Sequence, residues 1–140
     1  MKFEFSAGGI VYKKEAGQTF VLVSQHSGHQ GWVFPKGRIG DKEENKGQSK
    51  EETAIREVEE ETGAKGKIEK VLTPVTYFYV WEGERIKKTV DYFLMKYVGG
   101  DITKHDWEMQ AVEWLPKEEI LDRLTYSSDK EVWQEALKFF

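Results

Sequence analysis

Cysteine is absent from this chain of 140 residues. Its absence excludes disulfide bonds and thiolate metal sites. Any metal ion would have to be held by oxygen or imidazole ligands, which favours a hard cation such as Mg²⁺ or Mn²⁺.

An excess of basic residues and long apolar runs are also lacking. The chain has 21 Lys and Arg against 25 Asp and Glu, a net charge of −4, which argues against binding to nucleic acid through a basic face. The first five residues, Met1 to Phe5, lack the architecture of a signal peptide, and no apolar run reaches membrane-spanning length. We therefore expect a cytoplasmic protein with neither a nucleic-acid nor a membrane partner.

The composition excludes a disordered chain, because 39% of the residues are hydrophobic and 14% are aromatic. No repeat or low-complexity linker divides the sequence. A chain of this length can bury its own core, so we expect one domain over residues 1–140.

The first third of the sequence is typical of short strands. Alternating or continuous apolar residues predict strands over 3–13, 20–23 and 32–34, with a turn at 16–18 and the last strand stopped by Pro35 and Gly37. The charged stretch from Gly40 to Gly47 indicates an exposed loop.

A helix follows this loop. Ser49 and Glu52 form a capping box, which predicts a helix beginning there. The helix should run to Thr62 and stop at Gly63. At about 100° per residue, one arc should face the core, made of Ala54, Ile55 and Val58.

The rest of the chain returns to strands and ends in helices. Strands are predicted over 68–72, 76–81, 89–98 and 111–115, with a hairpin turn at 82–84. Helices are predicted over 117–124 and 129–140, and the second has an apolar stripe of Val132, Trp133, Ala136, Leu137 and Phe140. This order of elements predicts an α+β fold, a mixed sheet with helices on both faces.

Three carboxylates stand close together on the central helix. Glu57, Glu60 and Glu61 have i, i+3 and i+4 spacing, where like charges repel by about 0.2–0.5 kcal/mol per pair. The helix dipole disfavours them further near the C-terminal end. Such broken local rules often mark a functional site, and a divalent cation would turn the repulsion into coordination. The alternative is a solvated acidic face.

The segment that holds these carboxylates, Arg56-Glu57-Val58-Glu59-Glu60-Glu61-Thr62-Gly63-Ala64, resembles the second half of the Nudix signature, G-x5-E-x7-R-E-U-x-E-E-x-G-U, where U is a bulky aliphatic residue. The resemblance extends to three other segments, Ala7-Gly8-Gly9-Ile10-Val11, Phe34-Pro35-Lys36-Gly37 and Glu108 with Glu113-Trp114. It implies the Nudix fold, an α/β/α sandwich around a mixed β-sheet.

The sequence departs from the signature in two places. Gln48 occupies the position of the first signature glutamate, and ten residues rather than five separate it from Gly37. Gln48 keeps a hydrogen-bond acceptor but loses the charge, so activity would be reduced. The five extra residues either lengthen a surface loop or create a new site.

The resemblance implies a role for each acidic residue. Glu57, Glu60 and Glu61 would bind Mg²⁺ or Mn²⁺, and Glu108 would be a fourth ligand or the general base, with Glu57 as the rival base. Arg56 would orient Glu57 through a salt bridge. Glu52, one turn earlier, could compete for Arg56.

Five further residues are candidates for substrate binding. Lys36, Arg38 and Lys88 could pair with phosphates. Tyr77 and Tyr79 share one face of a strand, together with Trp81, and could stack on adenine. The alternatives are solvated lysines and arginine, and aromatic rings in the core.

Within the family, the sequence is most similar to the bis(5′-nucleosyl)-tetraphosphatases, which split diadenosine tetraphosphate into ATP and AMP. Three alternatives stay open: a housecleaning nucleoside triphosphate pyrophosphohydrolase, a diphosphoinositol polyphosphate phosphohydrolase, and a nucleotide-binding module with weak turnover, which Gln48 favours. In each case we expect a small-molecule substrate or ligand and a monomer or homodimer.

Overall fold

The computed structural model describes residues 1–40 and 42–140. Asp41, which belongs to the loop predicted at 40–47, lies outside the described residues. The described strands are β1 (Lys2–Glu15), β2 (Gln18–His26), β3 (Trp32–Val33), β4 (Lys36–Arg38), β5 (Ala64–Val71), β6 (Val75–Trp81), β7 (Glu84–Gly100) and β8 (Met109–Pro116). The helices are α1 (Lys50–Thr62), α2 (Ile120–Arg123) and α3 (Ser127–Leu137), with 3₁₀ turns η1 (Glu43–Asn45), η2 (Ile102–Lys104) and η3 (Lys117–Glu119).

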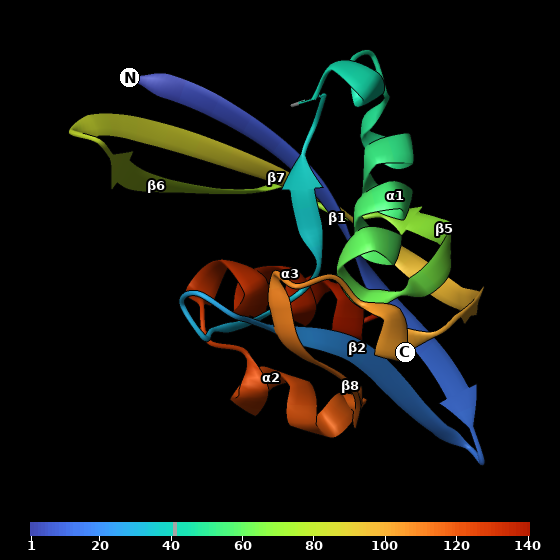
Figure 1. The fold of residues 1–140 in the computed structure, drawn as a ribbon. Helices are drawn as coiled ribbons and strands as arrows, with labels where there is room; N and C mark the ends of the chain where they lie inside the picture. The colour runs from blue at the N-terminus through green and yellow to red at the C-terminus, as the bar shows by residue number, and fades with distance from the viewer. Residues whose placement is uncertain (41) are drawn as a thin grey trace.

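The strands form one mixed sheet around a central parallel pair, β1 and β7 (Figure 1). Its main path runs β3-β2-β1-β7-β5, while β4 pairs with β1, β6 with β7, and β8 with β2. Only β1 and β7 are parallel among the described strands, and all other pairs are antiparallel.

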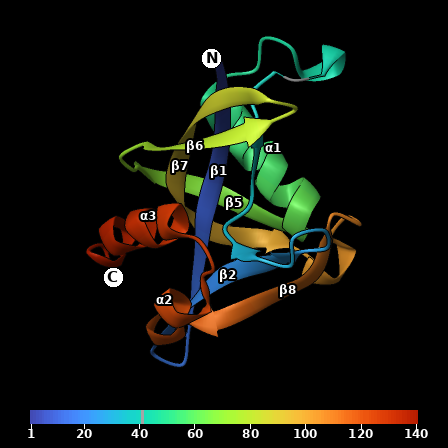
Figure 2. The same cartoon turned by 90° about the vertical axis from the view of Figure 1, so that its left-hand side faces the viewer.

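Two hydrophobic cores lie on opposite faces of this sheet, because side chains alternate along each strand. Ile10, Val21 and Val23 face α3, where they pack with Trp133 and Val132. The alternate residues of the same strands and of β7 pack against α1, in a cluster with Ala7, Val11, Leu22, Phe93, Met95, Ala54 and Val58. Figure 2 shows α1 and α3 on either side of β1. The predicted α+β fold, with helices on both faces, is confirmed.

The central helix has the predicted boundaries. The Ser49 hydroxyl accepts a hydrogen bond from the Glu52 amide at 3.1 Å, and the Glu52 carboxylate bonds back to the Ser49 amide at 3.2 Å. The helix ends at Gly63, whose φ of 81° suits glycine best. Ala54 and Val58 are buried as expected, but Ile55 is 39% exposed. The helix contacts the sheet along one line of i, i+4 and i+7 positions, which runs from Ala54 to Glu61 and leaves Ile55 to one side.

The strand predicted at 32–34 ends before Pro35 as expected, since β3 covers Trp32–Val33. A further strand was not predicted: Lys36–Arg38 form β4, which pairs antiparallel with Ser6–Gly8 of β1. The loop that follows is not wholly exposed. Asn45 is 3% exposed, and its side chain accepts a hydrogen bond from the Lys42 amide at 3.1 Å.

The other differences lie at element ends. β7 begins at Glu84, five residues before the predicted strand, because the hairpin turn at Glu82 and Gly83 keeps it paired with β6 from its first residue. The last helix covers Ser127–Leu137 rather than 129–140. Leu137 is 42% exposed, so it does not belong to the core-facing stripe.

No helix among the described residues is both long enough and apolar enough to cross a membrane.

Candidate active site

Strand β4 can lie close to α1 because β4 and its partner β1 each have a glycine, which has no side chain, where the chain segments approach one another. Gly37 lies opposite Ala7, and a Cβ at Gly37 would overlap the Glu57 carboxylate. A Cβ at Gly8 would overlap the carbonyl oxygen of Pro35. The missing side chains therefore let β4 approach the face of α1 that carries Glu57.

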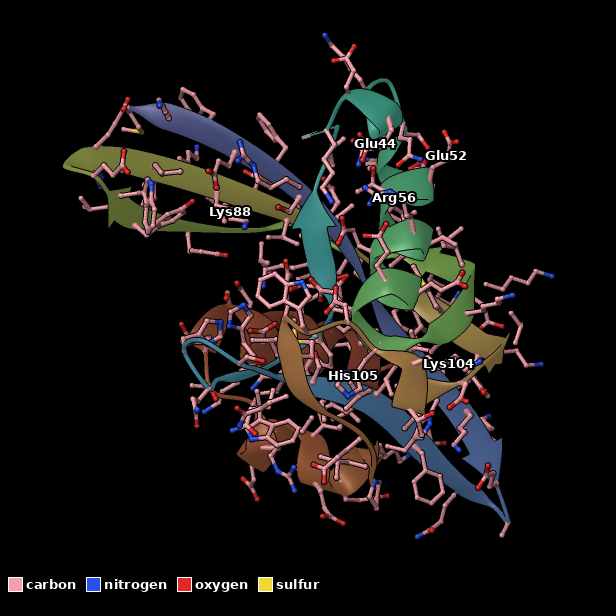
Figure 3. The ribbon with its side chains drawn as sticks, viewed as in Figure 1. Glu44, Glu52, Arg56, Lys88, Lys104 and His105 are labelled. Carbon is pink, nitrogen blue, oxygen red and sulfur yellow. The ribbon has the colours of Figure 1, made fainter. Side chains whose placement is uncertain are left out.

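Arg56 links the carboxylates of α1 to the residue that departs from the signature. Its Nη1 donates to Glu57 at 3.0 Å and to Glu60 at 3.1 Å. Its Nε donates to the side-chain oxygen of Gln48 at 2.9 Å. The salt bridge expected between Arg56 and Glu57 is present, whereas Glu52 bonds to Ser49 instead of competing (Figure 3).

The carboxylates around Arg56 raise the pKa of its guanidinium group. Burial alone would lower the pKa of Arg56, but the hydrogen bond to Glu60 and the charges of Glu57 and Glu60 raise it overall. One nitrogen of the guanidinium, Nη2, is buried without a hydrogen-bond partner. Gln48 offers a single oxygen on this side, where a carboxylate would offer two.

Glu61 is the buried carboxyl group of the site, with 7% of its surface exposed. Its Oε2 accepts a hydrogen bond from the backbone amide of Lys36 at 3.2 Å, which ties α1 to the start of β4. Burial raises the pKa of Glu61 to about 8, the charges of Glu57 and Glu108 add to the rise, and Lys36 opposes it. Glu61 is therefore largely protonated at neutral pH when no cation is bound.

Glu108, which is distant from α1 in the sequence, lies near Glu61. It precedes β8, its amide donates to the Asp106 side chain at 3.1 Å, and its carbonyl accepts from the Ser27 amide at 2.8 Å. Its charge acts on Glu61. Glu57 and Glu108 thus both lie within electrostatic range of Glu61. Glu60 pairs with Arg56 and has a side chain that is 47% exposed.

The donor chemistry of this cluster fits a hard divalent cation. Three carboxylates provide oxygen ligands, and a cation would offset the cost of ionising Glu61 in a buried position. In the present rotamers, no three acidic or histidine side chains among residues 1–40 and 42–140 stand close enough together to hold a metal ion. Binding would therefore draw the side chains inward.

A cleft of about 490 Å³ opens beside Lys36. Its lining includes four of the five residues predicted to bind substrate, Lys36, Tyr77, Tyr79 and Lys88. The other lining residues are His29, Val33, Tyr126, Ser127, Ser128 and Asp129. Arg38 is not part of the lining; it is 56% exposed and pairs with Glu4 at 3.8 Å. Trp81 shares a strand face with Tyr77 but lies beyond the cleft and is 64% exposed.

The cleft is basic near the carboxylates. Lys88 comes from β7, and Figure 3 shows it on the other side of β4 from Arg56. Burial, with the charge of Lys36, lowers the pKa of Lys88 to about 8. Two partly desolvated lysines can attract phosphate groups in spite of the negative net charge of the chain.

Aromatic rings also line the cleft. The rings of Tyr77 and Tyr79 have centroids 6.3 Å apart, and the ring of His29 lies 5.4 Å from that of Tyr126. The Tyr126 hydroxyl is hydrogen-bonded to His29 Nδ1 at 2.8 Å. These rings form a wall on which a nucleobase can stack.

Asp129 is a buried carboxyl group of the cleft that was not predicted from the sequence. It is 3% exposed, and its Oδ1 accepts from the Phe34 amide at 3.4 Å and the Tyr92 hydroxyl at 3.3 Å. Burial raises the pKa of Asp129, and Lys36 opposes the rise. Asp129 lies in the first turn of α3, where acidic residues are common because they interact favourably with the helix dipole. Its position in the sequence therefore does not indicate a functional role.

Comparison with known proteins shows the family of the chain. The family model described as "NUDIX domain" matches residues 2–136. A protein of Mycobacterium tuberculosis named as mutator protein MutT4 is 36% identical over 139 residues, which cover 95% of this chain and 54% of that protein. An 8-oxo-(d)GTP phosphatase of Mycolicibacterium smegmatis is 31% identical over 118 residues, 84% of this chain and 34% of the other. The chain thus spans about half or less of these relatives.

A solved structure, the binary complex of an Ap4A hydrolase from C. elegans, is similar over its whole length. It has a TM-score of 0.70 and 26% sequence identity, and the match covers 97% of this chain and 96% of that one.

The unpaired nitrogen of Arg56 leads to a prediction for residue 48. In Gln48→Glu, a carboxylate would accept from both Nε and Nη2, so we expect the free energy of unfolding to rise by about 1 kcal/mol. Urea denaturation would measure the change. Gln134→Glu makes the same change of charge at an exposed position of α3 and should have little effect. A loss of stability in Gln48→Glu would contradict this account of Arg56.

Burial of Glu61 leads to a second prediction. Its folded pKa of about 8 lies above the unfolded value of 4.5, so its stabilising contribution is complete below pH 4.5 and is lost as pH rises toward 8. Glu61→Gln cannot ionise and avoids this loss. Without metal, we expect the variant to match the wild type at pH 5 and to exceed its Tm by about 5 °C at pH 8. Thermal unfolding in EDTA across this range tests it; parallel Tm profiles would contradict it.

Proposed function

Because this chain belongs to the NUDIX family, we propose that it hydrolyses a phosphoanhydride bond in a nucleoside diphosphate-linked substrate, and that the substrate is diadenosine tetraphosphate, split into ATP and AMP. The observation that carries the proposal is that the cleft and the carboxylates meet at Lys36, which lines the cleft and donates a hydrogen bond from its backbone amide to Glu61. The cleft lining holds aromatic rings and two lysines, and Glu57 and Glu108 lie within electrostatic range of Glu61.

The groups of the cleft lie within reach of one another and of the carboxylates. Tyr77 is the cross-strand partner of Lys88, and Asp129 lies within electrostatic range of Lys36. Lys36 in turn bonds through its backbone amide to Glu61. A nucleotide can therefore bind with its base against the rings, its phosphates beside the lysines and a scissile bond near the carboxylates.

In this arrangement the protein would position substrate and remove a proton. Lys36 and Lys88 would hold the phosphates by charge-assisted hydrogen bonds. Divalent metal ions held by Glu57, Glu60, Glu61 and Glu108 would supply charge neutralisation and a more acidic water. The water oxygen bonds to phosphorus, the anhydride P–O bond breaks, and the leaving phosphate keeps the electron pair. Glu57 or Glu108 accepts the proton of the water.

Arg56 would act in this reaction without touching substrate. It holds Glu57 and Glu60 at 3.0 and 3.1 Å, so it fixes where two of the carboxylates can point. Gln48 supports Arg56 at 2.9 Å even though it lacks the charge of glutamate. This contact supports an active enzyme rather than a binding module that has lost turnover.

A second candidate is a nucleoside triphosphate pyrophosphohydrolase, which would use the same carboxylates and release a monophosphate and pyrophosphate. It is favoured by the names of two relatives, the mutator protein MutT4 and the 8-oxo-(d)GTP phosphatase. The cleft would bind the single base of such a substrate against the same rings.

Lys88 gives a prediction for the dependence on pH. With its pKa lowered to about 8, it loses its positive charge as pH rises above 8. We expect kcat/KM to fall by up to about tenfold more between pH 8 and 9.5 in the wild type than in Lys88→Arg, whose guanidinium stays charged. Initial rates at limiting substrate test this. Equal profiles for the two proteins would remove Lys88 from phosphate binding.

Product analysis tests the proposed reaction. Anion-exchange chromatography of diadenosine tetraphosphate incubated with protein and Mg²⁺ should show ATP and AMP in equal amounts. Glu57→Gln and Glu60→Gln should each lower the rate, with a loss of at least about 100-fold for Glu57→Gln. EDTA should stop the reaction in the wild type.

Other outcomes would separate the alternatives. Intact dinucleotide, with monophosphate and pyrophosphate formed from a nucleoside triphosphate, would replace the first substrate with the second. Intact substrates of both kinds, with and without metal, would contradict the proposed hydrolysis.

A further inference from the structure

Strand β6 (Val75–Trp81) is an open edge of the sheet. One side of this strand pairs with β7, and no other segment within residues 1–40 and 42–140 hydrogen-bonds the backbone of its other side. Figure 1 shows β6 on the outer side of β7, where the hairpin projects away from α1. An open edge presents a row of N–H and C=O groups that can pair with a further strand.

The sequence of β6 favours such pairing. Its seven residues, Val-Thr-Tyr-Phe-Tyr-Val-Trp, include no charged residue, no proline and no glycine. All of them are β-branched or aromatic, which are the side chains that strands prefer. The register with β7 is regular over all seven pairs, so no bulge twists the edge away. A regular, uncharged edge strand of this kind readily accepts another strand.

The other open edges of the described sheet carry features that oppose pairing. β5 has three lysines and two register shifts along its pairing with β7. β8 has Glu113 and ends at Pro116. The start of β1 has Lys2 and Glu4, and β3 and β4 are only two and three residues long. Charges, proline, bulges and short strands all protect an edge from association. Among the described strands, β6 is the edge that lacks them.

We propose that two copies of this chain associate by antiparallel pairing of their β6 strands, about a two-fold axis at Phe78. Phe78 is the middle residue of the strand, so an axis there pairs all seven residues. Tyr77 would lie opposite Tyr79 of the second copy, and Val75 opposite Trp81. Such aromatic and β-branched pairs stabilise a sheet, and no like charges meet because the strand has none. The strand is thus complementary to itself, as a two-fold interface requires.

The same pairing gives the exposed Trp81 a place to bury its ring. A groove of about 490 Å³ lies between the start of β6, at Thr76 and Tyr77, and the residues of α3 between 127 and 134. Opposed side chains in antiparallel strands point to the same face. Trp81 of the second copy would therefore lie beside Val75, on the face of the sheet that α3 covers. Trp81 is 64% exposed in the single chain. Because Tyr77 and Ser127 line both this groove and the substrate cleft, each cleft would have a ring of the other copy beside it.

Sedimentation velocity of the purified chain tests the association. The wild type should have twice the mass of one chain at micromolar concentration. Phe78→Lys places two positive charges opposite each other across the axis, so we expect the dissociation constant of the dimer to rise at least about tenfold. Phe78→Glu should do the same with two negative charges. An equimolar mixture of these two variants should form dimers again, because opposite charges then meet. Phe78 is 49% exposed, and circular dichroism would check that both variants fold.

The matched control is Phe3→Lys. Phe3 is 61% exposed and lies in register with Lys87 of β7, which also pairs with Phe78. The same change of residue is therefore made on the same face of the sheet, two strands away from the edge. This variant should keep the dissociation constant of the wild type.

A cross-link tests the position of the axis. The chain contains no cysteine, so an introduced thiol has no other thiol of its own chain to react with. Directly opposed residues of antiparallel strands have Cβ atoms about 4.5–5.5 Å apart. Under mild oxidation, Phe78→Cys should give a disulfide-linked dimer on a non-reducing gel. Thr76→Cys lies on the same face but would face Val80 of the second copy, so it should stay uncross-linked.

Three results would overturn this assembly: a wild type that is monomeric at every concentration, a dimer that persists in both charge variants of Phe78, or equal cross-linking at positions 76 and 78. A monomer would leave the edge to a strand of a different protein. None of these measurements involves nucleotide, so their outcome is independent of the proposed hydrolysis.

Discussion

A carboxyl group placed on the core-facing line of a helix is the constraint on which the site depends. Ala54, Val58 and Glu61 follow one another at i, i+4 and i+7, so the line that packs α1 onto the sheet ends in an acid with 7% exposure. Its hydrogen bond to the Lys36 amide holds the start of β4 against the helix. The cost of keeping an acid in this position is the source of its raised pKa. A bound cation would stabilise the ionised form of Glu61 in this buried position, whereas an apolar residue there would offer a cation no ligand.

The helix and the insertion before it are joined through Arg56. Its guanidinium spans from Gln48, at the end of the lengthened loop, to Glu57 and Glu60 within the helix. The insertion therefore ends where the signature resumes, and η1 and the buried Asn45 organise part of it. A longer loop could be accommodated because its two ends are fixed by β4 and by the Ser49 cap.

The sequence predicted the elements whose signals are local. The capping box at Ser49, the stop at Gly63 and the alternation along β1 all act between residues a few positions apart, and the structure has each of them. β4 was missed because its pairing with Ser6–Gly8 joins distant segments of the chain and depends on one glycine in each of them, Gly8 and Gly37, which no local pattern connects. In the cleft, Tyr126 and Asp129 were missed for a related reason. They reach it only after α3 packs on the far face of the sheet, and nothing local distinguishes them from the start of an ordinary helix.

The parallel pairing of β1 with β7 has a consequence for how the chain folds. Each paired residue of β1 lies more than half the chain away from its partner in β7, and no short connection can align them. Helix α1 lies between these strands in the sequence. Its core-facing side packs on both β1 and β7, so part of its packing surface is missing until β7 pairs with β1. Pairings of such high sequence separation form slowly, because the loop must close before any contact offsets its entropy. The two sides of the cleft would then form together, late and cooperatively, when the centre of the sheet closes.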